Sequence, residues 1–434
     1  MAEVTYGNEF RGGRVTLPPS KSVAHRAMLC AALSRGSCAL SHMAGSQDID
    51  ATARAIEALG GQVRLEEDRG LCLVEGAGLG RAQGGVIHCG ESGSTLRFLI
   101  PIACALGGRW TFTGEGRLPQ RPLDVYRELL PAHGVRYQDP GREFLPLTVE
   151  GRLEPGVFAL PGNVSSQFIT GLLLALPLLS GDSEIVLTTP LESEGYVNLT
   201  LQAMERFGVT ACRIGRGWRV PGGQRYRPQN LAVEGDWSQA AFFLTMAALA
   251  PGGERVELAG LSRDSLQGDK ACVELFEGFG LDLRWEGDLL LCSNPRAGEP
   301  FRGLRGQVID AAQIPDMVPA LSVCAALSQG ETAIVNAQRL RLKESDRLAA
   351  MEAALTALGG KALSREDGLV LKGVETLKGG RALGVNDHRV VMALAGAALG
   401  SRGPVTVTDA WSVRKSYPGF FDDFKRLGGI AHVL

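Results

Sequence analysis

Apolar residues along the chain gather into six helical stretches that follow one plan. Each stretch starts with Ser or Asp, continues as an almost wholly apolar run at helical spacing, and closes near a glycine. The closing glycines recur every 70 to 78 residues, which is too regular for chance and indicates an internal repeat. The six stretches cover residues 20–36, 92–107, 165–181, 236–252, 316–330 and 387–400.

Each apolar stretch is followed by the same succession of elements. A β-rich run comes first, then an amphipathic second helix that ends in glycine, and then short strands with a turn signal between them. The closing glycine sits where a helix needs a left-handed residue after its last turn. The second helices are predicted at residues 54–60, 126–134, 198–208, 271–280, 347–359 and 419–428.

The repeats predict an α/β protein of two domains with three repeated units in each. A chain of 434 residues is too long for one ordinary core. We place the crossings near Pro18 and Leu231, so one domain covers residues 19–230 and the other covers residues 1–18 plus 231–434. The second domain then holds both chain ends, and the run 4–10 can supply the strand that the sixth repeat lacks.

Composition excludes several classes of function. The chain carries 45 Lys and Arg against 47 Asp and Glu, so it lacks the electrostatic footprint of a nucleic-acid binder. Its apolar stretches are shorter than the roughly 20 residues that a membrane span needs, and residues 1–10 do not resemble a leader peptide. The nine cysteines form no CxxC pair, which favours reduced thiols in a cytoplasmic protein over disulfides or a metal site.

Charged and hydroxyl side chains concentrate at the starts of the six apolar helices. Helix starts carry free N–H groups and the positive end of the dipole, so they are natural seats for anions. Capping alone would explain a Ser or Asp there. For Asp236 and Ser238, capping and an anion site are equally good interpretations. Capping does not require neighbouring cations, which are costly beside apolar helices unless an anion pairs with them. The cations in question are Lys21, Arg26, Arg97 and Arg389, with His388 next to the last.

The second helices add charged residues at their own starts. Lys343 and Arg347 lie four residues apart, and Glu344 lies within the same helical turn. A solvated face of ion pairs is the alternative interpretation of this segment. Arg121 and Lys415, however, occupy equivalent points in other repeats, which favours a shared site.

Brought together, these side chains would form a cationic cluster in a nearly neutral protein, suited to small and multiply anionic substrates. Asp316 and Glu344 would then be carboxylates among cations, and either could carry out proton transfer. The cluster comprises Lys21, Arg26, Arg121, Lys343, Arg347, Arg389 and Lys415.

Five motifs resemble those of the enolpyruvyl transferase family, and within it the branch of the shikimate pathway. They read LPPSKS at 17–22, LPGNVSSQ at 160–167, RLKESDR at 341–347, NDHR at 386–389 and KSYP at 415–418, and they span nearly the whole chain. The resemblance implies the family's pair of inside-out α/β barrels, with threefold internal pseudosymmetry in each domain. It also implies an active site in the cleft between the domains.

The same resemblance implies the substrates and the residues that hold them. The partners are shikimate 3-phosphate and phosphoenolpyruvate, with glyphosate as an inhibitor at the second site, and we expect a monomer without cofactor or metal. Shikimate 3-phosphate is assigned to Lys21, Ser22, Arg26, Ser165, Ser166, Gln167, Ser193, Asp316 and Lys343. Phosphoenolpyruvate is assigned to Lys21, Gly93, Arg121, Gln167, Arg347, Arg389 and Lys415.

The implied reaction transfers the enolpyruvyl group of phosphoenolpyruvate to the 5-hydroxyl of shikimate 3-phosphate. The hydroxyl loses a proton, the vinyl carbon gains one, and a tetrahedral intermediate then expels phosphate. We assign Asp316 to the hydroxyl proton, Glu344 to the methylene carbon, and Lys21 to a supporting proton or charge role. The roles of Glu344 and Lys21 can be exchanged.

Three positions depart from the family pattern. Glu91 stands where many relatives have Asn, and Ser94 where they have Thr. Arg339 stands where relatives often have Asn or Glu. We expect these departures to change affinity and inhibitor response rather than the class of reaction.

Two other functions fit part of the pattern. The sister transferase that acts on UDP-N-acetylglucosamine normally has Asn after the first-motif lysine, where this chain has Ser22. A non-catalytic sugar-phosphate or nucleotide-binding protein is the alternative from another class. Its nearest support, residues 90–95, lacks the lysine of a P-loop, whereas the paired carboxylates favour an enzyme.

Overall fold

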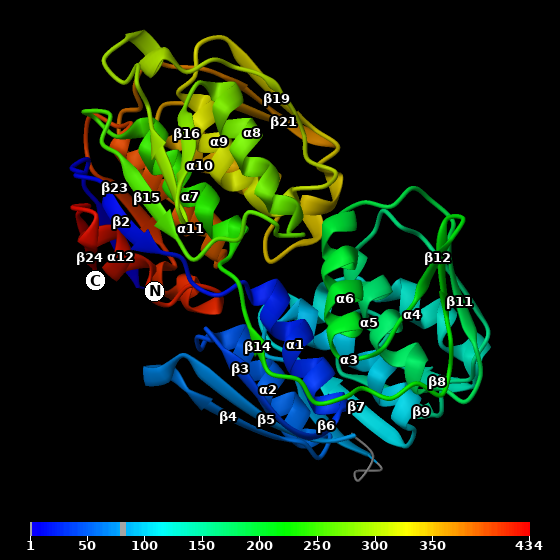
Figure 1. Ribbon diagram of the computed structural model, residues 1–434. Helices are drawn as coiled ribbons and strands as arrows, with labels where there is room; N and C mark the ends of the chain where they lie inside the picture. Colours follow the sequence, from blue (N-terminus) through cyan, green and yellow to red (C-terminus); the bar gives the residue numbers. More distant parts are fainter. Residues whose placement is uncertain (1, 79–83) are drawn as a thin grey trace. The chain divides into compact units, whose positions relative to one another are not determined.

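The computed structural model describes residues 2–78 and 84–434, which fold as two compact units. The continuous unit runs from Pro19 to Val233, and the split unit joins Met1–Pro18 to Glu234–Leu434, so that it holds both chain ends (Figure 1). The second crossing therefore lies three residues beyond the predicted boundary. The reason is that β14 (Leu231–Ala232) pairs with β3 (Arg35–Ser41) and stays with the continuous unit.

Each repeat forms one four-stranded sheet, and the described residues contain six such sheets. In the fifth repeat, β18 (Val308–Asp310) runs parallel to β19 (Glu331–Val335). β19 pairs antiparallel with β21 (Gly368–Lys372), which pairs antiparallel with β20 (Lys361–Arg365). The predicted α/β fold of six repeated units is confirmed.

The remaining strands follow in chain order. In the continuous unit they are β4 (Gln62–Glu66), β5 (Leu71–Ala77), β6 (Gly84–His88), β7 (Arg109–Thr113), β8 (Val135–Gln138), β9 (Leu147–Gly151), β10 (Val157–Leu160), β11 (Ser183–Leu187), β12 (Cys212–Ile214) and β13 (Gly217–Val220). In the split unit they are β1 (Glu3–Tyr6), β2 (Gly13–Thr16), β15 (Val256–Ala259), β16 (Asp282–Glu286), β17 (Leu289–Ser293), β22 (Gly380–Ala382), β23 (Val405–Thr408) and β24 (Ala431–Val433).

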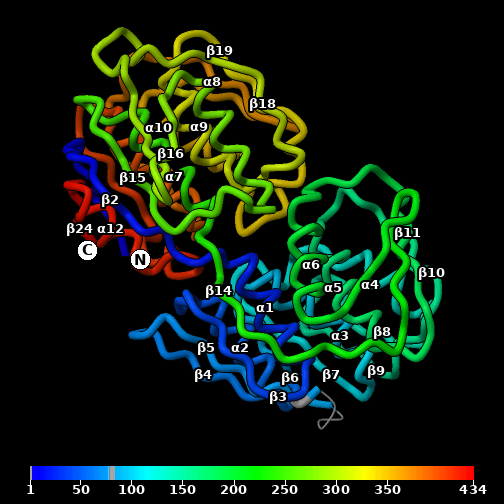
Figure 2. The backbone as a smooth tube through the Cα atoms, in the orientation of Figure 1, coloured from blue at the N-terminus to red at the C-terminus, as the bar shows by residue number. Residues whose placement is uncertain are grey.

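The amino-terminal segment completes the split unit. β1 lies between β23 and β24 and is antiparallel to both, so the prediction that this run supplies the missing strand is confirmed. β2 runs parallel to β15 in the sheet of the fourth repeat. The first and fourth repeats thus exchange edge strands. β2 precedes the first helix of the first repeat but joins the sheet of the fourth repeat, and β14 precedes the first helix of the fourth repeat but joins the sheet of the first (Figure 2).

The first helix of each repeat lies inside its unit, with the sheets around it. α7 (Trp237–Leu249), α9 (Val318–Ala326) and α11 (His388–Leu399) are buried along their whole length. Helices that are apolar all round can be stable only within a core. The corresponding helices of the continuous unit are α1 (Lys21–Leu33), α3 (Gly93–Leu106) and α5 (Ser166–Ala175).

The second helices were predicted at the right places, but three of them start earlier than expected: α4 by two residues, α6 by four and α2 by seven. α2 begins at Gln47 because Ser46 accepts a capping hydrogen bond from Ile49, and α6 begins at Glu194. The others are α4 (Asp124–Leu129), α8 (Cys272–Phe279), α10 (Arg347–Ala357) and α12 (Phe420–Arg426), and α2 and α6 end at Ala58 and Arg206. All six closing glycines have the predicted positive φ: Gly60, Gly134, Gly208, Gly280, Gly359 and Gly428.

Two further features bear on the expected class of protein. Within residues 2–78 and 84–434, no helix combines the length and apolar character needed to cross a membrane. The nine cysteines are free thiols, and eight of them are buried.

Candidate active site

In the repeats, the start of the second helix faces the start of the first helix. Asp48 accepts a hydrogen bond from Lys21 Nζ at 2.5 Å in the first repeat. Arg347 donates to Asp316 at 2.8 Å in the fifth. Lys415, from the short helix η9 (Ala410–Lys415), donates to the backbone oxygen of Asn386 at 2.7 Å. The polar residues picked out at two kinds of helix start therefore form pairs within repeats.

Arg347 is the centre of the polar cluster in the split unit. Its side chain is 1 % exposed and donates to three carboxylates. Nη1 contacts Asp316 Oδ1 at 2.8 Å, Nη2 contacts Glu344 Oε2 at 2.7 Å, and Nε contacts Asp387 Oδ2 at 2.8 Å. Burial alone would lower the pKa of Arg347, but these three charges together raise it above its ordinary value.

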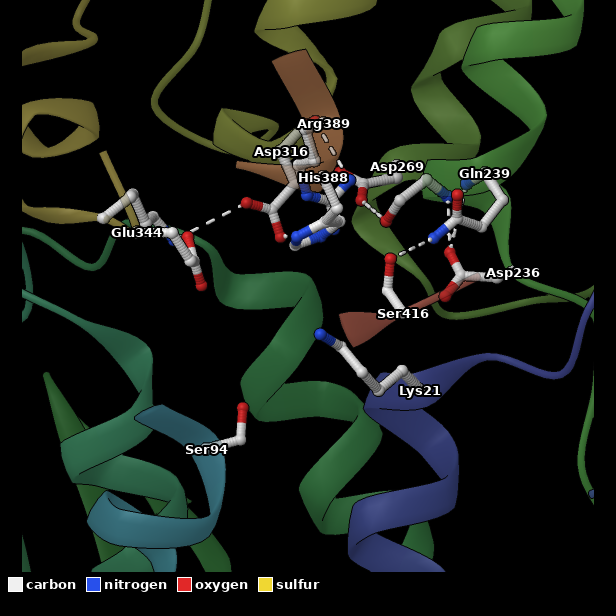
Figure 3. A network of polar contacts seen from close by, with 12 residues as sticks. Lys21, Ser94, Asp236, Gln239, Asp269, Asp316, Glu344, His388, Arg389 and Ser416 are labelled. Atoms are coloured by element: carbon white, nitrogen blue, oxygen red, sulfur yellow. Dashed lines mark hydrogen bonds and ion pairs between the residues drawn. The ribbon is translucent and has the colours of Figure 1, made fainter. Parts of the chain in front are cut away.

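Asp316 is held by cations from three elements. Besides Arg347, it accepts from Arg389 Nη2 at 3.1 Å (Figure 3). Lys343 Nζ lies 3.6 Å from its Oδ1. Arg389 also donates to the backbone oxygen of Asp316 at 3.1 Å. The structure thus brings together five of the residues predicted from the sequence: Asp316, Lys343, Glu344, Arg347 and Arg389. It adds Asp387, which caps α11 and is the third carboxylate that Arg347 binds.

Lys343 is the cation whose charge is most sensitive to its surroundings. Burial lowers its pKa to about 8, and the nearby positive charge of Arg347 acts in the same direction. Asp316 and Glu344 oppose this effect. Lys343 is therefore a cation that can lose its charge just above neutral pH unless an anion stabilises it.

Asp269 joins this cluster, although the sequence did not single it out. It lies in η5 (Gly268–Ala271), is 2 % exposed, and accepts a hydrogen bond from Ser238 Oγ at the start of α7. Burial, followed by the charge of Asp316, raises its pKa to about 6. No motif or local pattern in the sequence marks this residue.

The capping interpretation of Asp236 is confirmed. Its Oδ1 accepts from the backbone N–H of Ser238 at 2.8 Å and of Gln239 at 3.3 Å. Gln239 in turn contacts Ser416 Oγ at 3.4 Å (Figure 3). Ser238 does more than cap, because its hydroxyl group binds Asp269.

In the continuous unit, Arg26 is committed mainly to the fold. It is 3 % exposed and donates to Thr200 at 2.8 Å, Thr170 at 3.2 Å, and the backbone oxygens of Ser22 and Tyr196. Burial lowers its pKa to about 10. Four of the five N–H donors of a guanidinium are used in this way, so little of the group is left for a ligand.

Gln167 has an amide group of fixed orientation. Its Oε1 accepts from Arg97 Nη1 at 2.8 Å, and its Nε2 donates to Ser94 Oγ at 3.0 Å. Arg97 also donates to the backbone oxygen of Pro122 at 3.0 Å. Arg97 was noticed beside a helix start but not assigned a role, and the structure makes it the residue that orients Gln167.

The remaining predicted residues of the continuous unit lie at helix starts. Ser165 caps α5 by accepting from the N–H of Gln167, and Ser166 and Ser193 are buried. Gly93 is the first residue of α3, and a Cβ atom there would lie 2.5 Å from Nη1 of Arg121. The Arg121 guanidinium group therefore lies against the first turn of α3, in space that a side chain at residue 93 would occupy.

A search of the described residues for three or more His, Cys, Asp or Glu side chains that could hold a metal ion finds none. The acidic side chains of the split-unit cluster are instead balanced by Arg347, Arg389 and Lys343. The arrangement thus provides carboxylates suited to proton transfer and cations suited to anionic groups.

Comparisons with known proteins agree with this chemistry. Residues 7–424 match the family model described as EPSP synthase (3-phosphoshikimate 1-carboxyvinyltransferase). The 3-phosphoshikimate 1-carboxyvinyltransferase of Clostridium perfringens is 44% identical over 422 residues, or 96% of each chain. That of Clostridium kluyveri is 44% identical over 420 residues, covering 96% of this chain and 95% of its own.

A solved structure supports the same assignment. EPSP synthase from Acinetobacter baumannii superposes with a TM-score of 0.81 at 25% identity, covering 100% of both chains. With a family model that spans most of the chain and relatives at 44% identity, the chain belongs to the EPSP synthase family, the 3-phosphoshikimate 1-carboxyvinyltransferases.

Proposed function

We propose a division of labour among these residues in the reaction of this enzyme, the transfer of the enolpyruvyl group from phosphoenolpyruvate to the 5-hydroxyl of shikimate 3-phosphate. The observation that carries the proposal is the pairing of the Asp316 carboxylate with Lys343, Arg347 and Arg389. Glu344 pairs with Arg347 as well. Both proton-transfer groups are then placed beside the charges that anionic substrates need.

Asp316 takes the proton from the 5-hydroxyl group. A carboxylate that is fixed by Arg347 and Arg389 keeps its orientation, and general-base catalysis depends on such positioning. Glu344 delivers a proton to the methylene carbon of phosphoenolpyruvate. Lys21, paired with Asp48, gives the supporting charge or exchanges roles with Glu344.

Phosphoenolpyruvate binds to Arg121, Arg347, Arg389, Lys415 and Lys21. Its phosphate and carboxylate are suited to the bidentate geometry of guanidinium groups. The N–H groups at Gly93 and the amide of Gln167, which Arg97 orients, complete this set.

Shikimate 3-phosphate binds to the hydroxyl groups of Ser22, Ser165, Ser166 and Ser193, to Gln167, and to Lys343 together with Asp316. Arg26 can add one N–H, since its other donors hold α5 and α6. Most of these groups belong to the continuous unit, whereas the phosphoenolpyruvate ligands come from both units: Lys21, Gly93, Arg121 and Gln167 from the continuous unit and Arg347, Arg389 and Lys415 from the split unit. The proposed reaction therefore needs residues of both units.

Three finer expectations accompany this proposal. Glyphosate, which carries a phosphonate and a carboxylate, competes with phosphoenolpyruvate for the same cations. The enzyme works as a monomer. It works in the cytoplasm, which is supported by its free and mostly buried thiols.

The decisive experiment measures inorganic phosphate released from phosphoenolpyruvate by the purified chain. We expect release only when shikimate 3-phosphate is present, and none with UDP-N-acetylglucosamine in its place. Glyphosate should raise the apparent KM for phosphoenolpyruvate without lowering the maximal rate. Release that occurs with the nucleotide sugar, or no release with either acceptor, would overturn the proposal.

A further inference from the structure

Arg339 belongs to a short helix that lies beside the cationic cluster. It is part of η8 (Gln338–Leu342), just ahead of Lys343, and is 9 % exposed. Its Nη2 donates a hydrogen bond to the backbone oxygen of Ala312. This hydrogen bond ties the Arg339 guanidinium group to the backbone of the split unit.

The carbonyl that Arg339 binds lies on the segment leading into Asp316. This segment connects β18 to η7 (Pro315–Met317), and Asp316 is the middle residue of η7. On its other side, the Ala312 peptide donates its N–H to Asp310 Oδ1 at 2.8 Å. Ala312 is therefore held through both its N–H and its C=O, and the backbone is fixed four residues ahead of Asp316.

Arg339 also contributes charge at Lys343. Burial opposes the charge of the Lys343 ammonium group, and so do the positive charges of Arg347 and Arg339. The carboxylates of Asp316 and Glu344 favour it. Arg339 lies in the segment just ahead of Lys343, so its positive charge acts on the ammonium group from nearby. Removing the charge of Arg339 should thus make Lys343 hold its proton to higher pH.

We infer that Arg339 is a positioning residue of this enzyme, which clamps the loop that carries Asp316 and limits the charge of Lys343, and that it is not a substrate ligand. The inference rests on the proposed roles of Asp316 and Lys343. It gives a purpose to a residue type that departs from the Asn or Glu expected at this position.

The test compares Arg339→Gln and Arg339→Lys with Arg341→Gln. Arg341 lies in the same helix and donates to Asp346 at 2.8 Å and to backbone oxygens, so its variant controls for damage to η8. Steady-state kinetics are measured from pH 6 to 10. In parallel, the Lys343 ammonium is titrated by NMR of lysine-labelled protein, with its signal identified from Lys343→Arg.

For Arg339→Gln we expect kcat to fall by about 10-fold to 100-fold, since a misplaced catalytic group can cost that much, while both KM values change by less than about threefold. The alkaline limb of kcat/KM for shikimate 3-phosphate should move to higher pH, and so should the NMR titration of Lys343. Arg339→Lys should restore the alkaline limb fully and kcat only in part. Arg341→Gln should match the wild type.

The alternatives give different results. A KM for shikimate 3-phosphate that rises more than tenfold with kcat unchanged would make Arg339 a ligand, and wild-type behaviour of Arg339→Gln would remove its role altogether. Should the wild type itself fail to release phosphate, the proposed function fails. The NMR titration then still decides the inference, because an unchanged Lys343 pKa in Arg339→Gln would overturn it.

Discussion

Arg347 Nη2 holds Glu344 Oε2 at 2.7 Å, within one turn of chain. The residue proposed to bind phosphoenolpyruvate is thus paired, before any ligand arrives, with the residue proposed to protonate it. An incoming carboxylate or phosphate that binds Arg347 must compete with Glu344. Once the anion has displaced it from Arg347, the Glu344 carboxylate can take up from solvent the proton that it then delivers, which links catalysis to the presence of the correct anion.

This relationship predicts a split effect for Glu344→Gln. The variant loses the competing charge, so the KM for phosphoenolpyruvate should stay the same or fall. Without the proton donor, kcat should fall by roughly 10²-fold to 10⁴-fold, the usual contribution of general acid catalysis. Steady-state kinetics with saturating shikimate 3-phosphate measure both values, and a KM that rises with an unchanged kcat would contradict the assignment.

Asp316→Ala should lower turnover far more than it weakens phosphoenolpyruvate binding. A proton-transfer group acts mainly in the transition state, so its loss appears in kcat. Removing the carboxylate also leaves Lys343, Arg347 and Arg389 with less negative charge, which favours anion binding. Glyphosate titration by calorimetry, in the presence of shikimate 3-phosphate, provides the binding value. Near-normal turnover in a folded Asp316→Ala protein would rule out the proposed role.

Lys343→Met and Arg347→Met each remove a cation proposed to bind an anionic substrate, but the two variants should differ in stability. Lys343 has a side chain that is 23% exposed and a single ion pair, so its variant should fold normally and raise the KM for shikimate 3-phosphate at least tenfold. Arg347→Met leaves buried carboxylates uncompensated, which costs about 3 to 5 kcal/mol. Urea unfolding followed by circular dichroism distinguishes the two. Equal stabilities would contradict the central role of Arg347.

The sequence predicted most of the scaffold because its helices are periodic and apolar. The six inner helices were located to within a few residues, and the strand at 4–10 was placed in the correct sheet, where it occupies Glu3–Tyr6. The starts of α2 and α6 were missed. Their first turns carry polar residues such as Asp48 and Glu194, which interrupt the apolar pattern by which a helix is recognised.

The site was predictable residue by residue, but its pairings were not. Motifs identified Arg347, although nothing in its spacing shows that Asp387, from another helix, accepts its Nε–H. The family resemblance assigns Arg26 to shikimate 3-phosphate, but its partners within the protein could not be predicted. Its partners Thr170 and Thr200 lie far along the chain and become neighbours only in the folded unit. Asp269 was missed because a single Asp in a polar loop carries no local signal.

Asp269 predicts a pH dependence of stability in the split unit. Its pKa in the folded protein is about 6, above the ordinary 3.8, so the folded state keeps its proton longer than the unfolded state. Stability from this group is present below about pH 4 and is lost as pH rises to about 6. The shift corresponds to at most about 3 kcal/mol. Asp269→Asn should therefore gain stability over the wild type between pH 4 and pH 7 in urea unfolding. A difference that does not change with pH would refute this account.

Gly93→Ala should weaken phosphoenolpyruvate binding without unfolding the protein. Gly93 is the first residue of α3, where alanine is a better helix former than glycine, so the backbone accepts the change. The new Cβ would lie 2.5 Å from Nη1 and 2.7 Å from Cζ of Arg121, and these atoms are the far end of a flexible side chain. Arg121 must therefore move. We expect the KM for phosphoenolpyruvate to rise about tenfold, a loss of one charge-assisted contact, while the KM for shikimate 3-phosphate stays within about twofold.

A double-mutant cycle identifies the route of the effect: if Gly93→Ala acts through Arg121, adding it to Arg121→Ala should change the KM for phosphoenolpyruvate no further. Additive losses in the double variant would show that the methyl group obstructs the substrate itself.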